Sequence, residues 1–162
     1  MWDRLIALMS ELLDLYQALL TLSRQKREIL IAGKAQSLES ITRQEELLIL
    51  QAGKLEVIRE KLIREIADHC GVSSQGLSFA AISELAEPAD AERLSALGTA
   101  FEQVSHELVP LNRLNTELIE QALRFVNYSI NILTQSQSSN TYEPHGKSGQ
   151  PQAGRAFFDA KA

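Results

Sequence analysis

Apolar residues recur at steps of three and four between Trp2 and Leu30, which is the spacing of one helical face. The pattern stops at Gly33–Lys34, and a second row with the same period runs from Leu38 to Ile66. Glycine often ends a helix because it adopts a left-handed backbone at little cost. The spacing therefore predicts long helices over about residues 2–32 and 36–69.

The two rows fit each other as an antiparallel pair. Members that face each other across a turn at Gly33–Lys34 have position numbers with a nearly constant sum, from Trp2 with Ile66 to Leu30 with Leu38. A constant sum is what an antiparallel αα-hairpin requires. The first part of the chain is therefore predicted to be such a hairpin.

A third row runs from Leu94 to Ile132 and predicts another long helix over about residues 90–134, with Asp90 as its N-cap. A short helix is expected over about 78–86, inside the connection between residues 72 and 88. Pro110 predicts a kink or a break close to residues 106–110, because proline lacks a backbone donor and clashes with the preceding turn.

These elements define an all-α fold, an elongated three-helix coiled-coil bundle formed by the hairpin and the kinked third helix. The bundle is expected to occupy residues 1–134. Residues 135–162 are polar and contain glycine and proline, so they are expected to form a disordered C-terminal tail.

The third helix carries a second apolar row in its C-terminal half, and two rows imply two neighbours. An antiparallel register that puts Leu94 opposite Ile66 brings Asn115 beside Glu45 and Ser23, which gathers the polar exceptions into one layer. The second row would then bind a partner or form a homodimer contact, unless the helix breaks at Pro110 and folds back. The second row consists of Ile119, Leu123, Val126, Ile130 and Leu133.

Charge and composition exclude several functions. The net charge of −5 and the pI near 5.3 make nucleic acid an unfavourable partner. Cys70 is the single cysteine, which rules out an intramolecular disulfide and suits a cytoplasmic location. The charged N-terminus shows neither a signal peptide nor a membrane-inserting span. Because no catalytic motif or metal-ligand spacing occurs, we expect no enzyme activity, metal or cofactor.

The polar residues on the apolar rows are expected to act as register devices. Glu45 and Arg59 would be paired charges that fix how the helices align. Asn112 and Asn115 would act in the same way, although their position at the start of the second row also makes contact with a partner plausible.

Several sequence segments resemble the FlgN family of flagellar export chaperones, and together they cover most of the chain. The most specific are the segment Leu111–Glu120, with its Asn-x-x-Asn pattern, the segment Asn140–Gly146, with Tyr-x-Pro-x-Gly, and the ending Phe158–Ala162. Weaker matches lie around Lys26–Lys34, Leu38–Thr42 and Leu55–Arg59.

The resemblance implies a cytosolic type III secretion chaperone for the hook-filament junction proteins FlgK and FlgL. It would bind their C-terminal helical regions, prevent premature assembly and deliver them to the export gate. Asn112, Asn115 and the second apolar row would bind the client, and Tyr142 would contact the export gate protein FlhA. The alternative is a coiled-coil structural protein that self-associates through the same row and has no client.

Overall fold

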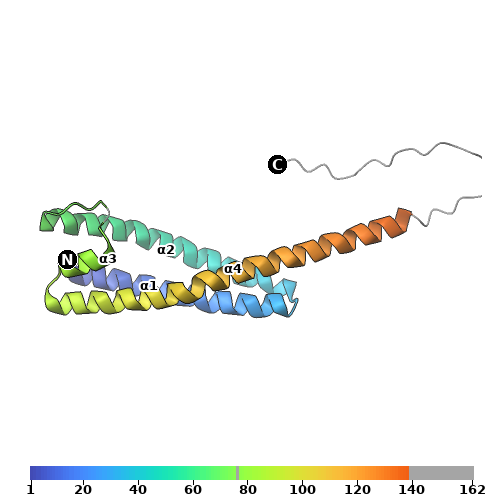
Figure 1. Cartoon of the computed structure of the whole chain (residues 1–162), viewed down its shortest axis with the longest axis horizontal. Coiled ribbons are helices and arrows are strands. Elements are labelled where there is room, and N and C mark those ends of the chain that lie inside the picture. The colour runs from blue at the N-terminus through green and yellow to red at the C-terminus, as the bar shows by residue number, and fades with distance from the viewer. Residues whose placement is uncertain (76, 139–162) are drawn as a thin grey trace, which may run out of the picture. The chain divides into compact units, whose positions relative to one another are not determined.

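The computed structural model describes residues 1–75 and 77–138, and every regular element within them is a helix. The four helices are α1 (Trp2–Ile31), α2 (Ala35–Cys70), α3 (Phe79–Glu84) and α4 (Pro88–Ser138) (Figure 1). The predicted all-α class of long, packed helices is confirmed. The tail was predicted to begin at residue 135, whereas α4 continues to Ser138; the rest of the predicted tail lies outside the described residues.

The chain divides into two compact units, and the division falls within helix α4. The first unit is Met1–Arg124, and the second begins at Phe125. All packing between helices that is described below belongs to the first unit.

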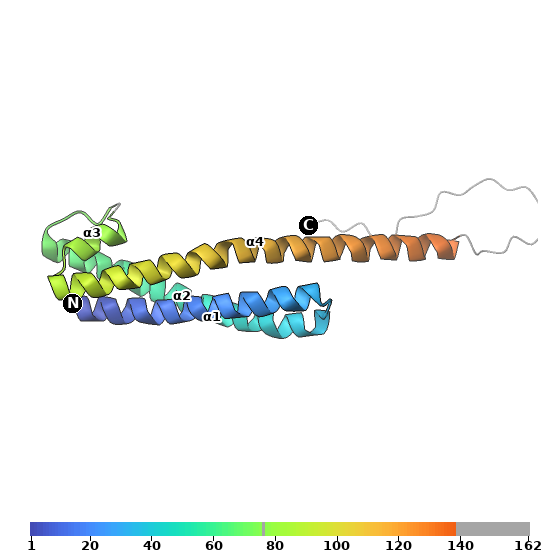
Figure 2. The ribbon, with the colours of Figure 1, turned by 60° about the horizontal axis from the view of Figure 1, so that its bottom comes forward.

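Helices α1 and α2 form the predicted antiparallel hairpin and lie side by side in both ribbon views (Figures 1 and 2). Gly33 has a φ of 66°, and its amide donates to the Leu30 carbonyl at 3.2 Å while that of Lys34 donates to Ile29 at 3.1 Å. This pair of bonds is the Schellman ending of a helix, in which glycine takes the left-handed position. The glycine that interrupts the sequence pattern therefore makes the hairpin turn.

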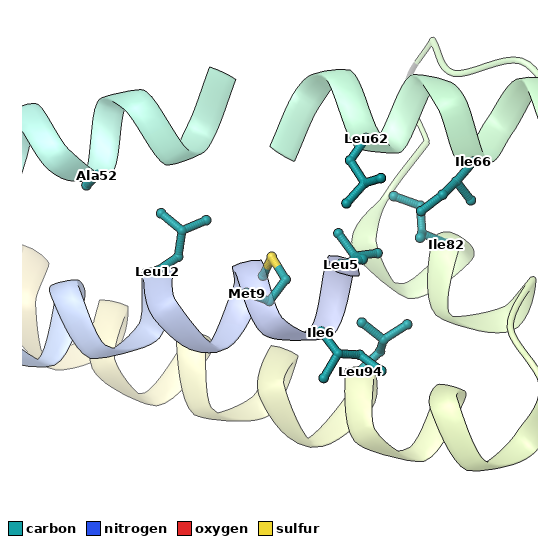
Figure 3. Packing of buried hydrophobic residues seen from close by; sticks show 9 residues of the cluster. All are labelled: Leu5, Ile6, Met9, Leu12, Ala52, Leu62, Ile66, Ile82 and Leu94. Carbon is teal, nitrogen blue, oxygen red and sulfur yellow. The ribbon is translucent and has the colours of Figure 1, made fainter. Parts of the chain in front are cut away.

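The main hydrophobic core joins all four helices near the open end of the hairpin. Leu5 of α1 lies among Leu62 and Ile66 of α2 and Ile82 of α3, while Ile6 meets Leu94 of α4 (Figure 3). Trp2 is partly buried and packs against this cluster. Leu94 and Ile66 thus share one cluster, as the antiparallel register requires.

A second core cluster joins α1 to α4. Leu13 and Leu20 of α1 pack with Val104 and Leu108 of α4. Next to them the rings of Tyr16 and Phe101 meet edge to face, with centroids 5.6 Å apart. Aromatic pairs prefer this geometry, so it adds to the stabilisation that comes from apolar burial.

The short helix α3 closes one side of the bundle. The hydroxyl of Ser78 accepts a hydrogen bond from the amide of Ala81 at 3.2 Å, which caps the helix start. The ring of Phe79 lies against Gly98 of α4, where an added Cβ would come within 3.1 Å of a ring carbon. A Cβ at this point would require the Phe79 ring to move by a few tenths of an ångström.

Helix α4 begins earlier than the sequence pattern suggested, so the predicted N-cap was wrong. Pro88 occupies the first helical position, and Asp90 lies inside the first turn. Proline is well suited to that position because its missing N–H would be unpaired there in any residue. The Asp90 carboxylate interacts favourably with the helix dipole, and it accepts a hydrogen bond from Arg93 at 3.3 Å.

Helix α4 continues through Pro110, so the break that was one of the two expected outcomes at residues 106–110 is not present, while the kink stays a prediction. Pro110 and His106 both lie on the exposed side of the helix, where the proline removes the helical donor of the His106 carbonyl. The core side of the helix at Leu108 keeps its packing.

Helix α1 is long and apolar enough to cross a membrane by length and composition alone, which the sequence interpretation had denied. Part of its apolar character has another explanation, because seven of its apolar residues are buried against the rest of the bundle. A core helix of a soluble bundle passes the same test. The buried residues of α1 are the apolar Leu5, Ile6, Met9, Leu12, Leu13, Leu20 and Leu22, together with Ser23.

Candidate functional site

The predicted layer of polar residues exists between the long helices. The side-chain amide of Asn115 donates to the Ser23 carbonyl at 2.9 Å, and the Ser23 hydroxyl donates to the side-chain oxygen of Asn112. Ser23 and Asn115 are each only 2% exposed. We call Ser23, Lys26, Glu45, Asn112 and Asn115 the polar layer.

The charged members of the polar layer join α1 to α2. The Lys26 ammonium lies 2.6 Å from the Glu45 carboxylate, and both side chains are largely buried. A charge buried in this way needs a partner close by, and each residue supplies one for the other. Arg59, the other charge expected on this face, pairs with Glu56 at 2.7 Å. Both predicted charges are therefore paired, but only the Glu45 pair joins two helices, since the Arg59 pair lies within α2.

The polar layer lines an open groove of about 520 Å³. Residues of α1, α2 and α4 contribute to it, among them Leu19, Ile49, Ala52, Leu108 and Ile119. The side-chain oxygen of Asn115 is buried there without a hydrogen-bond donor in the described part of the chain. The groove is therefore mainly apolar, with a few polar groups that fix how the helices align.

The structure places the two predicted asparagines differently. Asn112 is exposed and could be reached by a partner, whereas Asn115 is buried and bonded to α1. The register role expected for both residues fits their hydrogen bonds to Ser23. Client contact at either asparagine stays a prediction.

The second apolar row is exposed along most of its length. Leu123, Val126, Ile130 and Leu133 are 57%, 49%, 51% and 63% exposed, and Ile119 is half-buried. Helix α4 runs unbroken through Pro110, which contradicts the alternative in which it breaks there and folds back over the hairpin. We call these five residues the α4 stripe.

Three further apolar residues of α4 are exposed beside the α4 stripe. Phe125, Tyr128 and Ile132 are 70%, 64% and 46% exposed. Phe125 and Ile132 belong to the row that runs from Leu94 to Ile132. Such a row ordinarily marks a core face, so the sequence prediction did not include these two residues in the site. Tyr128 lies on neither row, and only its aromatic character in a polar setting could have drawn attention to it.

The charge along α4 changes abruptly after Arg124. Before that point Arg113 pairs with Glu117 at 3.1 Å and Arg124 lies 3.8 Å from Glu120. From Phe125 to Ser138 no residue carries a charge. A helical segment that is both uncharged and exposed on apolar residues is suited to contact with another protein surface.

Within 1–75 and 77–138, no group of three or more histidine, cysteine, aspartate or glutamate side chains could hold a metal ion. What the described residues do provide is an apolar helical surface and a groove beside it. An apolar helical surface beside a groove is suited to recognition of another chain.

An all-helical protein that exposes an uncharged apolar helix belongs, by its physical character, with proteins that bind other helices. The chain matches the FlgN protein family over residues 1–150 and belongs to that family. FlgN proteins are cytoplasmic flagellar export chaperones that bind hook-associated proteins, and they are not enzymes. The predicted resemblance is therefore confirmed at the level of the family.

A protein of Bacillus subtilis (strain 168) described as "Uncharacterized protein YvyG" is similar to this chain along its length. It is 29% identical over 159 residues, which make up 98% of this chain and 97% of that protein. No solved structure matches the chain significantly.

Proposed function

We propose that this flagellar export chaperone binds the C-terminal helical regions of the hook-filament junction proteins FlgK and FlgL through the α4 stripe. The observation that carries the proposal is the exposure of apolar side chains along an uncharged helical segment. Exposed apolar area of this extent lowers solubility unless a partner covers it.

The geometry of one helix face defines what kind of client segment fits. From Ile119 to Leu133 the α4 stripe extends over about 21 Å, at ~1.5 Å of rise per residue. A client helix of about four turns matches this length, with apolar residues at steps of three and four facing the stripe. Covering the apolar face of the client prevents it from pairing with other subunits before export.

The half-buried Ile119 belongs to both the α4 stripe and the apolar groove beside the polar layer. A client that packs along the stripe would therefore reach the groove at Ile119 and meet the exposed Asn112 there. We propose that Asn112 contacts the client directly, and that Asn115 contributes by fixing the alignment of α4 on α1.

Delivery to the export machinery is proposed to use Tyr142, which lies outside the described residues. In this proposal Tyr142 contacts the cytosolic domain of the export gate protein FlhA. Replacing it, as Tyr142→Ala, is expected to weaken gate binding at least about tenfold, or ~1.4 kcal/mol, while client binding stays unchanged. Equal loss of both activities would contradict separate client and gate sites.

The test of client binding is isothermal titration with a C-terminal helical fragment of FlgK or FlgL from the same organism. We expect stoichiometric binding with a negative heat-capacity change, which marks the burial of apolar surface. The double variant Leu123→Asp with Ile130→Asp is expected to abolish binding and to leave the helical circular dichroism nearly intact, because both side chains are exposed.

The matched control places carboxylates on the same helix but away from the stripe. Gln121→Glu with Asn131→Asp adds the same charge at two exposed positions and is expected to bind as the original chain does. If the fragment does not bind and the free chain forms a dimer that the stripe variant dissolves, the α4 stripe serves self-association instead. That result would overturn the proposal.

A further inference from the structure

Helix α2 carries another row of residues at steps of three and four, on the face away from its core row. Leu47, Leu50 and Val57 on this row are 61%, 62% and 67% exposed. Lys54 and Lys61 continue the row and are also exposed. We call Leu47, Leu50, Lys54, Val57 and Lys61 the α2 outer row.

The buried residues of α2 follow a different row. Ile41, Ala52, Leu62 and Ile66 are each at most 7% exposed and face the core. Because one helix needs one apolar stripe to join a bundle, a second stripe with coiled-coil spacing calls for a second neighbour. No described part of the chain covers the α2 outer row.

The two lysines distinguish this row from the other charged positions of α2. The arginines of α2 each lie close to a glutamate one turn away, at 2.6 Å for Arg43, 2.7 Å for Arg59 and 3.9 Å for Arg64. Lys54 and Lys61 form no ion pair within the described residues. Helix α2 thus pairs its arginines locally and leaves two cations free beside exposed leucine and valine.

We infer that the α2 outer row is a docking surface for an acidic amphipathic helix of another protein. Such a helix would place apolar residues on Leu47, Leu50 and Val57 and carboxylates opposite Lys54 and Lys61. The row spans about 21 Å, at ~1.5 Å per residue, so the partner helix needs about four turns. None of these residues belongs to the α4 stripe, so this surface is separate from the proposed client site.

Two other occupants fit the row less well. A second copy of the chain would bring the same positive row against the first, and like charges that meet across helices are destabilising. An anionic membrane fits less well because the row lacks the aromatic residues that anchor helices at lipid interfaces. An acidic helix satisfies both the apolar and the charged positions.

The test uses two designed peptides, each with leucine at core positions and with either glutamate or lysine at the positions facing Lys54 and Lys61. Binding to the full chain is followed by fluorescence anisotropy. We expect the glutamate peptide to bind, with an affinity that falls as salt rises. The variant Lys54→Glu with Lys61→Glu is expected to lose at least about tenfold in affinity for it and to gain affinity for the lysine peptide.

The control variant reverses two exposed cations elsewhere, Arg4→Glu with Lys34→Glu, so the change in net charge is the same. It is expected to bind the glutamate peptide as the original chain does at 150 mM salt, where distant charges are largely screened at about 8 Å. Circular dichroism of both variants shows whether the helices remain. A helical Lys54→Glu, Lys61→Glu variant that binds both peptides as the original chain does would overturn the inference.

Two further measurements decide between occupants. Flotation with vesicles of phosphatidylglycerol and phosphatidylcholine that requires Lys54 and Lys61 would overturn the inference in favour of a membrane. Light scattering that shows a dimer abolished by Leu50→Asp would overturn it in favour of a second copy. The FlgK or FlgL fragment is expected to bind the Lys54→Glu, Lys61→Glu variant as it binds the original chain. The test of the α2 outer row therefore does not depend on the proposed client site.

Discussion

The side-chain amide of Asn115 in α4 donates to the main-chain carbonyl of Ser23 in α1, and this 2.9 Å bond joins residues 92 positions apart in the chain. Both residues are almost completely buried. If α4 slid along α1 by one turn, the buried amide would lose this acceptor and face apolar side chains. The bond therefore favours one alignment of the helices over its neighbours, as single buried asparagines do in coiled coils.

Replacing Asn115 separates the cost of a polar group from the cost of a charge. Asn115→Leu is expected to change the free energy of unfolding by less than about 1 kcal/mol, because it removes a buried oxygen that has no donor along with one hydrogen bond. Asn115→Asp is expected to lower it by about 2–3 kcal/mol, because a carboxylate would be buried beside the Ser23 carbonyl. Urea unfolding followed by circular dichroism measures both, and equal stability of the two variants would contradict this account.

Two helical glycines provide a matched test of the packing of α3. An added Cβ at Gly53 meets no atom within 4 Å, so Gly53→Ala is expected to raise the free energy of unfolding by about 1 kcal/mol through helix propensity. At Gly98 the same Cβ would press on the Phe79 ring, so the gain is expected to be cancelled or reversed. Thermal unfolding compares the two, and an equal gain at both positions would show that Phe79 does not pack as described.

Pro110 is expected to lower the stability of α4 even though the helix continues through it. Pro110→Ala restores a donor for the His106 carbonyl, and we expect it to raise the free energy of unfolding by about 1–2 kcal/mol. Pro88→Ala is the control, because proline at the first helical position costs nothing and its replacement should bring no gain. If chemical denaturation gives both variants the same stability, the proline is not a source of strain.

The exposed end of α4 is expected to open locally in the free chain. Residues 125–138 lack charged pairs and are exposed at most apolar positions, so their amides should exchange with deuterium faster than those around Val104 and Leu108, which lie in a core cluster. A bound client helix should slow this exchange. Mass spectrometry of peptides from both regions measures the difference, and slow exchange of residues 125–138 in a free monomer would contradict it.

The helices and their alignment could be predicted because each rests on a periodic pattern. The two apolar rows on either side of Gly33 predicted the hairpin. The register that puts Asn115, Ser23 and Glu45 in one layer is the one that the structure shows for α4. The sequence also indicated that the α4 stripe needs a second neighbour, but it left open whether that neighbour is a partner or the chain itself.

The wrong predictions came from local rules that the surroundings override. Pro110 does not break α4 because it lies on the exposed side, and a sequence without a known core face does not reveal which side that is. Asp90 is not the N-cap, because the helix begins two residues earlier at Pro88. The α2 outer row was missed because the core row on the same helix already accounted for the pattern.

Trp2 is the single tryptophan of the chain, and it packs against the main core cluster, to which no residue of the α4 stripe belongs. Its emission is therefore a natural reporter of bundle folding. Carboxylates placed on the α4 stripe should leave the emission maximum unchanged, whereas melting of the hairpin should shift it to longer wavelength. Tryptophan emission therefore distinguishes a folded variant that no longer binds its client from a variant that has unfolded.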